Sequence, residues 1–229
     1  MARYLRDISI HLGSGQELPN GLSQRDFNIT THTVQDIFLY MIPKRFEFGN
    51  ILKLNIGVKG TDAVSSEIRN FDGYVHYDYI GFDFKNYFRV SKGEQNVIIL
   101  EVLRDVLRRV PEQNQENKGI ALGITDKISD QNFKYSFESS LSKMQRSKRF
   151  KAIVEIHIND EGQNAYLRIE KKDGETIFET FLLKNIVYEF YKNLHKSKWQ
   201  KDKFIIMNRD GGIYREFEIK KEANTVHSK

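Results

Sequence analysis

Two Glu-x-Lys triplets on predicted strands and one His-x-Asp pair have a spacing that is usable for catalysis. The triplets are Glu170-Lys171-Lys172 and Glu218-Ile219-Lys220. On a strand, each would place a carboxylate and a lysine on one face. In a Mg²⁺-dependent nuclease the carboxylate binds the metal and the lysine stabilises the attacking water. A chain this rich in Glu and Lys contains about two such triplets by chance, so solvated surface pairs are the simpler interpretation.

His76 and Asp78 share one strand face, a spacing that suits a metal ion or an acid-base pair. No third ligand can be assigned, and the six histidines are scattered, so we expect a structural or surface role. The sequence has no phosphate-cradling glycine loop, no nucleophile elbow and no His-Glu-x-x-His motif. Cysteine is absent, which excludes a cysteine nucleophile and a disulfide framework. We therefore expect no catalytic residues, no metal and no cofactor.

A second kind of chemistry is carried by aromatic and cationic residues of a predicted hairpin. The Asp-Gly pair of Lys172-Asp173-Gly174-Glu175 predicts a type I′ turn, because both central residues need positive φ. Counting outward from this turn pairs Tyr166 with Phe181, and Arg168 with Glu179, on one face of the hairpin. The other face is apolar and pairs Ile169 with Phe178, Leu167 with Thr180 and Ala165 with Leu182.

The strand over 150–158 precedes this hairpin and repeats its division into two faces. An amphipathic helix over 186–194 is expected to cover the apolar side. The face left open would then carry five side chains, Tyr166, Phe181, Arg168, Lys151 and His157. Aromatic rings beside cations hold single strands by stacking bases and neutralising phosphates. The alternative is that the face packs against the other half of the chain or a second subunit, as in a homodimer.

The first half has strand patterns over 4–12 and 51–59, and 73–90 is long enough for two strands. The range 31–43 is β-branched and aromatic and is assigned to a strand, whereas 13–26 and 60–70 are expected to be loops. The apolar spacing over 94–110 predicts a helix that Pro111 ends. Further candidate nucleic-acid contacts on the strands of this half are Lys53, Lys59, Tyr87 and Arg89.

The polar segment 112–119 is the expected linker between a first unit, 1–111, and a second unit, 120–229. Both halves show strands, an Asp-Gly turn and an amphipathic helix in the same order, so a pseudo-repeat is a hypothesis. A hairpin over 203–220 would end the fold. The run Ser142–Lys151 has five cations and is expected to be a solvated basic loop that could touch phosphates.

Short matches in the second half agree with a known repeat. They are Phe150, Gly162, Tyr166-Leu167-Arg168-Ile169, Thr176-Ile177 and Glu189-Phe190. In these residues, segment 150–198 resembles the purine-rich-element binding (PUR) repeat. That repeat is a four-stranded antiparallel sheet followed by a helix, related in architecture to Whirly-type single-strand binders. The resemblance implies that the exposed sheet face, rather than the helix, meets single-stranded nucleic acid.

The charge and the hydrophobic content of the whole sequence limit the possible partners and locations. The net charge of +5 helps a polyanion to approach but does not by itself hold one. No stretch reaches the ~20 apolar residues needed to span a bilayer, and the first residues lack a signal-peptide core. We therefore expect a soluble cytoplasmic protein with no membrane partner.

These patterns predict an α+β protein of two antiparallel sheet-and-helix units with a C-terminal hairpin. The predicted function is non-enzymatic binding of single-stranded DNA or RNA, with Tyr166 and Phe181 stacking bases and Arg168, Lys151 and Lys172 neutralising the backbone. The alternative is a protein-interaction module, such as a bacterial inhibitor or immunity protein. A Mg²⁺-dependent nuclease ranks below both.

Overall fold

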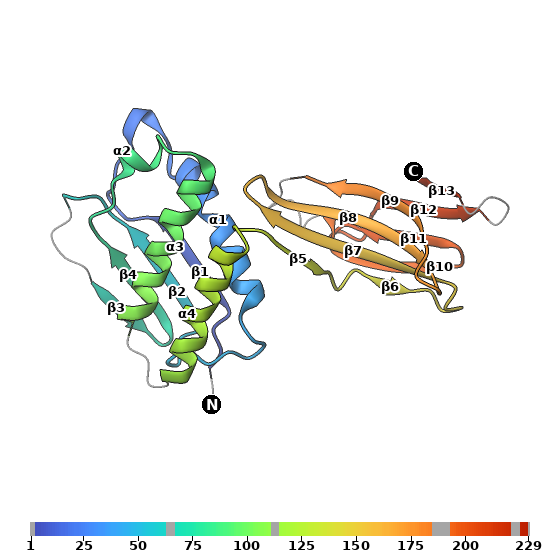
Figure 1. Cartoon of the computed structure of the whole chain (residues 1–229), viewed down its shortest axis with the longest axis horizontal. Helices are drawn as coiled ribbons and strands as arrows, with labels where there is room; N and C mark the ends of the chain where they lie inside the picture. The colour runs from blue at the N-terminus through green and yellow to red at the C-terminus, as the bar shows by residue number, and fades with distance from the viewer. Residues whose placement is uncertain (1–2, 63–66, 111–114, 185–192, 221–224, 229) are drawn as a thin grey trace. The chain divides into compact units, whose positions relative to one another are not determined.

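The chain divides into two compact units, residues 1–134 and 135–229 (Figure 1). The structure is a computed structural model that describes residues 3–62, 67–110, 115–184, 193–220 and 225–228. It contains helices and antiparallel sheets, so the α+β class is confirmed. Within the described residues, no helix has the length and apolar character needed to cross a bilayer.

The first unit is one layer of helices on a four-stranded sheet of order β1-β2-β4-β3. Its elements are β1 (Asp7–Leu12), a 3-10 turn η1 (Pro19–Gly21), α1 (Gln24–Met41), β2 (Lys53–Val58), β3 (Ile68–Phe71), β4 (Tyr74–Tyr79), α2 (Phe84–Tyr87), α3 (Lys92–Arg109) and α4 (Gln115–Asp130). β1, β2 and β4 are parallel, and only β3 pairs antiparallel. The antiparallel sheet predicted for this half was therefore wrong, because parallel neighbours need the long crossovers that α1 and the segment before β4 provide. The hypothesis of a pseudo-repeat is also wrong, because the sheet of the first unit is mostly parallel and the sheets of the second unit are antiparallel.

The prediction of a strand over 31–43 was wrong, because these residues belong mostly to α1. Ser23 and Asp26 form a capping box that starts the helix. Its buried positions Phe27, Val34 and Phe38 recur at helical spacing. The signal that decides the structure lies eight residues before the ambiguous stretch, in a segment expected to be a loop.

α1 also closes one edge of the sheet. The Ile10 N–H donates to Gln35 Oε1 at 3.0 Å, and the Thr31 hydroxyl donates to the Ile10 carbonyl at 2.9 Å. The Leu12 N–H donates to Asn28 Oδ1 at 3.2 Å. Helix side chains thus satisfy backbone groups of β1 that would otherwise be free to pair with another strand.

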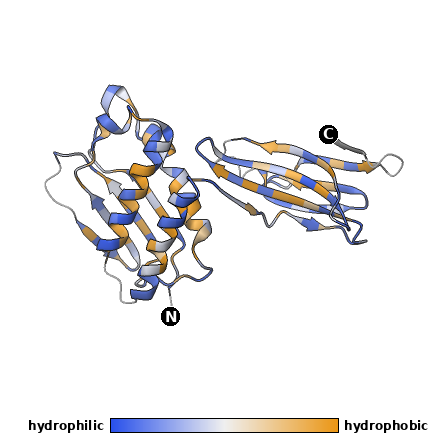
Figure 2. Cartoon of the chain, viewed as in Figure 1, coloured by the Kyte–Doolittle hydropathy of each residue, from blue (hydrophilic) through white to orange (hydrophobic). Residues whose placement is uncertain are grey.

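The helices leave one face of this sheet uncovered (Figure 1). Alternate strand residues such as Ile10, Ile56 and Val75 are buried beneath α1 and α3, and Figure 2 colours many residues of these strands and helices as hydrophobic. The predicted helix over 94–110 is confirmed as α3, which begins at a Ser91–Glu94 capping box. Polar residues alternate onto the opposite side, which we call the open face of the first unit.

Two boundaries in the first unit differ from the prediction. Only β4 forms within 73–90, because Asp83 caps the short helix α2. The expected linker also fails, since its residues 115–119 form the first turns of α4, and residues 111–114 lie outside the described residues. Arg104 of α3 holds α4 by donating to Thr125 at 3.1 Å and to Asp126 at 2.9 Å. The units separate after Lys134 instead.

The second unit consists of two antiparallel sheets. One sheet has the order β5-β7-β8-β9 with β6 also pairing β7, and the other has the order β10-β11-β12-β13. The strands are β5 (Tyr135–Glu138), β6 (Lys143–Met144), β7 (Phe150–Asn159), β8 (Gly162–Lys171), β9 (Thr176–Leu183), β10 (Lys196–Gln200), β11 (Lys203–Met207), β12 (Ile213–Lys220) and β13 (Thr225–Ser228). The three strands expected over 150–182 and the C-terminal hairpin are confirmed.

The second sheet covers the apolar side of β7, β8 and β9. Phe178 meets Phe217 with ring centroids 5.7 Å apart, and the Tyr214 hydroxyl donates to the Leu182 carbonyl at 3.4 Å. The sheet-and-helix arrangement predicted for this unit is thus replaced by sheet on sheet for the contacts that the described residues make. The helix expected over 186–194 falls mostly on 185–192, outside the described residues.

The turn between β8 and β9 is not the predicted type I′ turn. Gly174 has a φ of 90°, but Asp173 has no positive φ, and the Gly174 N–H donates to the Lys171 carbonyl at 3.0 Å. The loop therefore has three residues and ends in a left-handed glycine. An irregularity beside Glu170 restores the expected register, so Tyr166 still faces Phe181. Asp72 and Gly73, with φ of 53° and 90°, have the type I′ signs instead.

Replacing Ile128 tests whether α4 belongs to the first unit. Its side chain is fully buried, so Ile128→Ala should lower the free energy of unfolding by about 2–4 kcal/mol. Lys127→Ala, one residue away and exposed, should change it by less than about 0.5 kcal/mol. Urea denaturation of both variants measures this. Equal, small effects would contradict the packing of α4.

Candidate functional sites

Three aromatic rings lie side by side on the outer face of the β7-β8-β9 sheet. His157 and Tyr166 have ring centroids 4.8 Å apart, and Tyr166 meets Phe181 edge to face at 5.3 Å. Phe181 is 40% exposed, and the other two are partly exposed. The sequence predicted this grouping, which we call the aromatic row.

The cations beside the aromatic row are already paired with carboxylates. Arg168 Nε lies 2.8 Å from Glu170 Oε1, and its terminal nitrogen lies 3.5 Å from Glu155. Lys151 Nζ lies 3.0 Å from Glu138. Glu179 adds a further carboxylate opposite Arg168. Acidic residues therefore outnumber Lys151 and Arg168 on this face, and a phosphate would have to displace a carboxylate to reach either cation.

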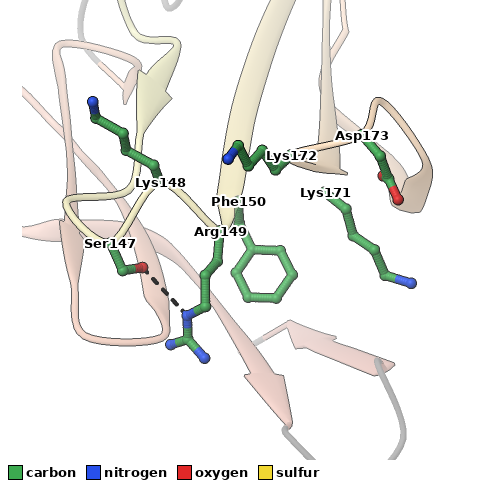
Figure 3. A pocket seen from close by; sticks show the side chains of 7 residues that line it. All are labelled: Ser147, Lys148, Arg149, Phe150, Lys171, Lys172 and Asp173. Atoms are coloured by element: carbon green, nitrogen blue, oxygen red, sulfur yellow. Dashed lines mark hydrogen bonds between the residues drawn. The ribbon is translucent and has the colours of Figure 1, made fainter.

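A more cationic surface lies at the end of this unit, beside the β8–β9 turn (Figure 3). It is an open hollow of about 850 Å³, which we call the basic hollow. Its lining residues are Ser147, Lys148, Arg149, Phe150, Lys171, Lys172 and Asp173. Four of the seven are cationic and one is acidic. Lys172 is the only residue among the predicted contacts that lines it.

The groups of the basic hollow differ in how firmly they are held. Arg149 lies 5.7 Å from the centre of the Phe150 ring and pairs with Asp202 at 2.8 Å. Lys171 pairs with Glu175 at 2.7 Å, a hydrogen bond that raises the pKa of the lysine. Within the part of the chain that the structure describes, Lys148 and Lys172 have no carboxylate at ion-pair distance. Figure 3 shows Lys172 extending toward the Phe150 strand and Lys148 extending away from it.

The predicted contacts of the first unit are split apart. Lys53 and Lys59 lie on or beside the open face, where they pair with Asp7 at 2.6 Å and Asp78 at 3.0 Å. Tyr87 was wrongly placed on an exposed strand face, because it is 1% exposed in α2. Its hydroxyl donates to Thr30 at 2.6 Å, and burial raises its pKa. Arg89 is exposed but follows α2, so it shares no strand with Tyr87.

The open face of the first unit holds a group that the sequence pointed to only in part. The rings of His11 and His76 lie 5.9 Å apart, and we call them the histidine pair. His11 lies near the carboxyl end of β1 and His76 lies in the middle of β4, on either side of β2. In the register, His11 faces Gly57, and Gly57 faces Asp78. A β-carbon on Gly57 would lie 3.1 Å from Asp78 Oδ1 and 3.3 Å from His76 Nε2. The side chains of His76 and Asp78 therefore pack closely against the backbone of this glycine.

Asp78 forms ion pairs with the cationic side chains beside the histidine pair. Its carboxylate is 2% exposed and lies 3.0 Å from His76 Nε2, 3.0 Å from Lys59 Nζ and 3.6 Å from Arg69. Burial opposes its ionisation, but the hydrogen bonds from Lys59 and His76 outweigh burial and lower the pKa of Asp78. The pKa of His11 is lowered by burial first and by the positive charge of His76 second.

Two exposed aromatic side chains lie on the same open face. Phe71 is 67% exposed and Tyr74 is 54% exposed, and they face each other across the β3–β4 turn. Arg69 faces His76 in the next pair of the register on that face. The i, i+2 spacing of His76 and Asp78 had suggested an acid-base pair, but His11 lies on a strand whose parallel pairing the sequence did not reveal.

Neither a metal centre nor a known relative accounts for these sites. In residues that the structure describes, no three His, Asp or Glu side chains are placed to hold a metal ion. Comparison with protein families, curated proteins and solved structures found no match to this chain.

Replacing Asp78 should make stability less dependent on pH. A carboxylate whose folded pKa is lowered stabilises the fold above its unfolded pKa, about 3.9, and this contribution disappears as the pH falls through the folded pKa. Asp78→Asn should therefore cost about 1–3 kcal/mol at pH 7 and progressively less below pH ~4. The exposed Asp62→Asn is the control. Urea unfolding between pH 3 and pH 7 measures both, and a pH-independent loss would contradict the assigned ionisation.

Proposed function

We propose that this chain binds single-stranded nucleic acid and that the basic hollow is its main contact in the second unit. The supporting observation is the set of four cationic side chains around the partly buried ring of Phe150, with one carboxylate among the lining residues. Lys148 and Lys172 are exposed and have no acidic partner among the residues that the structure describes, so a phosphate can pair with them at low cost. This moves the proposed contact from the sheet face to its end.

The chemistry of the basic hollow matches what a single strand presents. A base that stacks on an aromatic side chain contributes about 1–3 kcal/mol, and phosphates bind by releasing counterions. Arg149 beside Phe150 offers a planar cation next to an apolar ring. Neither interaction depends on base identity, so we expect weak sequence preference. An intracellular location fits this proposal and the absence of cysteine.

The open face of the first unit supports a second contact of the same kind. Phe71 and Tyr74 expose their rings beside Arg69, which is 49% exposed as a side chain. The cations of this face are paired with carboxylates, so stacking contributes more to binding there than charge does.

The aromatic row supports a second candidate function, the docking of a protein partner. Its rings are exposed, and the neighbouring face carries more carboxylates than cations. A phosphate backbone is repelled by such a surface, whereas a protein surface with apolar side chains ringed by Lys or Arg is complementary to it. We therefore assign Tyr166 and Phe181 to protein contact rather than to base stacking.

Reversing the two unpaired lysines tests the nucleic-acid proposal. The double variant Lys148→Glu, Lys172→Glu should weaken binding of a fluorescent single-stranded DNA oligonucleotide at least tenfold at low salt. The slope of log affinity against log salt should become shallower by about 1 to 2, as two phosphate contacts are lost. Fluorescence anisotropy across a salt series measures both. Lys127→Glu, an exposed site on α4, is the matched control, and equal affinity of all three proteins would refute the proposal.

Truncating Phe181 separates the two surfaces. If the aromatic row serves a protein partner, Phe181→Ala should leave oligonucleotide affinity within about twofold of the unaltered protein. A loss of the size expected for one stacked base, about 1–3 kcal/mol, would place the strand on the row instead. Phe150→Ala, measured in the same anisotropy assay, should show that loss.

A further inference from the structure

The imidazoles of His11 and His76 lie close together on the open face of the first unit, above a glycine of the strand between them. His11 and His76 approach to 5.9 Å between ring centroids, with a 52° angle between their planes. The residue between them on β2 is Gly57, which has no side chain to separate them. His11 lies near the carboxyl end of β1 and His76 lies in the middle of β4, so the pair is on the open face of the sheet, where both strands present alternate side chains.

The surroundings of the two rings differ in the sense that acid-base catalysis needs. His76 Nε2 lies 3.0 Å from the buried carboxylate of Asp78, which leaves Nδ1 for a substrate. His11 has no carboxylate at ion-pair distance among the described residues, and its Nδ1 is buried without a hydrogen bond. The different partners suit the two rings to different roles, His76 as the acid and His11 as the base.

A substrate that carries its own nucleophile suits this pair. The chain has no cysteine, and none of the described residues places a serine or threonine hydroxyl in hydrogen-bonding contact with either imidazole. No three-ligand metal site is present among these residues either. RNA carries its nucleophile beside each phosphate, as the 2′-hydroxyl.

We propose that the histidine pair cleaves single-stranded RNA by transferring the 2′-oxygen to the adjacent phosphorus. Neutral His11, through Nε2, takes the proton of the 2′-hydroxyl while the O2′–P bond forms. The P–O5′ bond breaks, and the His76 imidazolium gives its Nδ1 proton to the departing O5′. The products are a 2′,3′-cyclic phosphate and a 5′-hydroxyl end, so the atoms and charges balance without a metal or a cofactor.

Neighbouring side chains supply the remaining parts of such a site. Lys59 and Arg69 share the carboxylate of Asp78, so this cluster keeps one positive charge that can offset the developing phosphorane, with His76 protonated adding a second. Phe71 and Tyr74 are exposed on the same face for the flanking bases. The inference takes from the proposed function only the class of ligand, which is single-stranded nucleic acid. The histidine pair lies in the first unit, whereas the basic hollow lies in the second.

Incubating the full chain with a labelled RNA oligonucleotide in EDTA tests the activity. We expect products ending in a 2′,3′-cyclic phosphate, identified by mass spectrometry, and no cleavage of the all-deoxy oligonucleotide. His11→Ala and His76→Asn should each lower the cleavage rate at least 100-fold, within the range that acid-base catalysis contributes. Affinity for the all-deoxy oligonucleotide should change less than threefold. His195→Ala, an exposed histidine of the other unit that belongs to none of the proposed sites, is the control and should keep full activity.

The pH profile distinguishes a chemical role from a structural one. The groups that face the pair are Lys53, Lys59, Arg69 and Asp78. The rate should be bell-shaped, as expected for one acid and one base acting together, and Asp78→Asn should alter that profile because it removes the carboxylate that contacts His76 Nε2. If either histidine variant does not fold, as judged by circular dichroism, Gly57→Ala replaces it and should displace the Asp-His contact with the same loss of rate.

The outcomes separate this inference from the proposed function. Binding of the all-deoxy oligonucleotide without cyclic phosphate formation from RNA would overturn the activity and leave the binding proposal standing. Cleavage that survives in a folded His11→Ala, His76→Asn protein would also overturn it, because the pair would not be responsible. RNA cleavage with no detectable binding of the all-deoxy strand would instead count against the basic hollow.

Discussion

The parallel pairing of β1, β2 and β4 decides which side chains of the first unit meet. In a parallel ladder, residues at the same height along each strand form a row, and successive residues alternate between faces. One row contains His11, Gly57 and Asp78, and the row before it contains Ser9, Asn55 and His76. A slip of one residue in β1 would turn His11 toward the helices and put Ile10 or Leu12 on the open face. The buried partners of α1 and α3 forbid that slip, so the apolar core holds the polar group in register.

The surfaces of this protein differ more in how their charged side chains are paired than in which residue types they contain. Asp78 can be buried as an anion because His76, Lys59 and Arg69 surround it. On the second unit, Arg168 pairs with Glu170 on its own strand and with Glu155 on β7, and Lys151 pairs with Glu138 on β5. Within the described residues, Lys148 and Lys172 at the turns have no carboxylate at ion-pair distance. The accessible positive charge therefore lies at the turns beside the basic hollow, whereas the aromatic row lies on the face of the sheet.

Sequence reasoning worked where the deciding contacts were local. The register that joins Tyr166 to Phe181 follows from strand alternation over a short hairpin, and α3 follows from a helical apolar pattern and a following proline. It failed where distant partners decided. Tyr87 is buried because α1 supplies Thr30 as its hydrogen-bond partner. The start of α4, residues 115–119, was assigned to a polar linker. Packing on α3 decides its place instead, and Arg104 of α3 bonds to Thr125 and Asp126 of α4.

From the sequence alone, the alternation of residues on β7, β8 and β9, the paired rings and the cation-rich segment over 142–151 were determined, because each depends on neighbours a few residues apart. The tertiary structure decided which of these groups is accessible and charged. It packed a second sheet on the apolar side of β7, β8 and β9, and it paired Arg168 and Lys151 with glutamates. It also brought together His11, Gly57 and Asp78, which are separated by 46 and 21 residues along the chain. Such contacts depend on strand order and crossover connections, which no local pattern of side chains encodes.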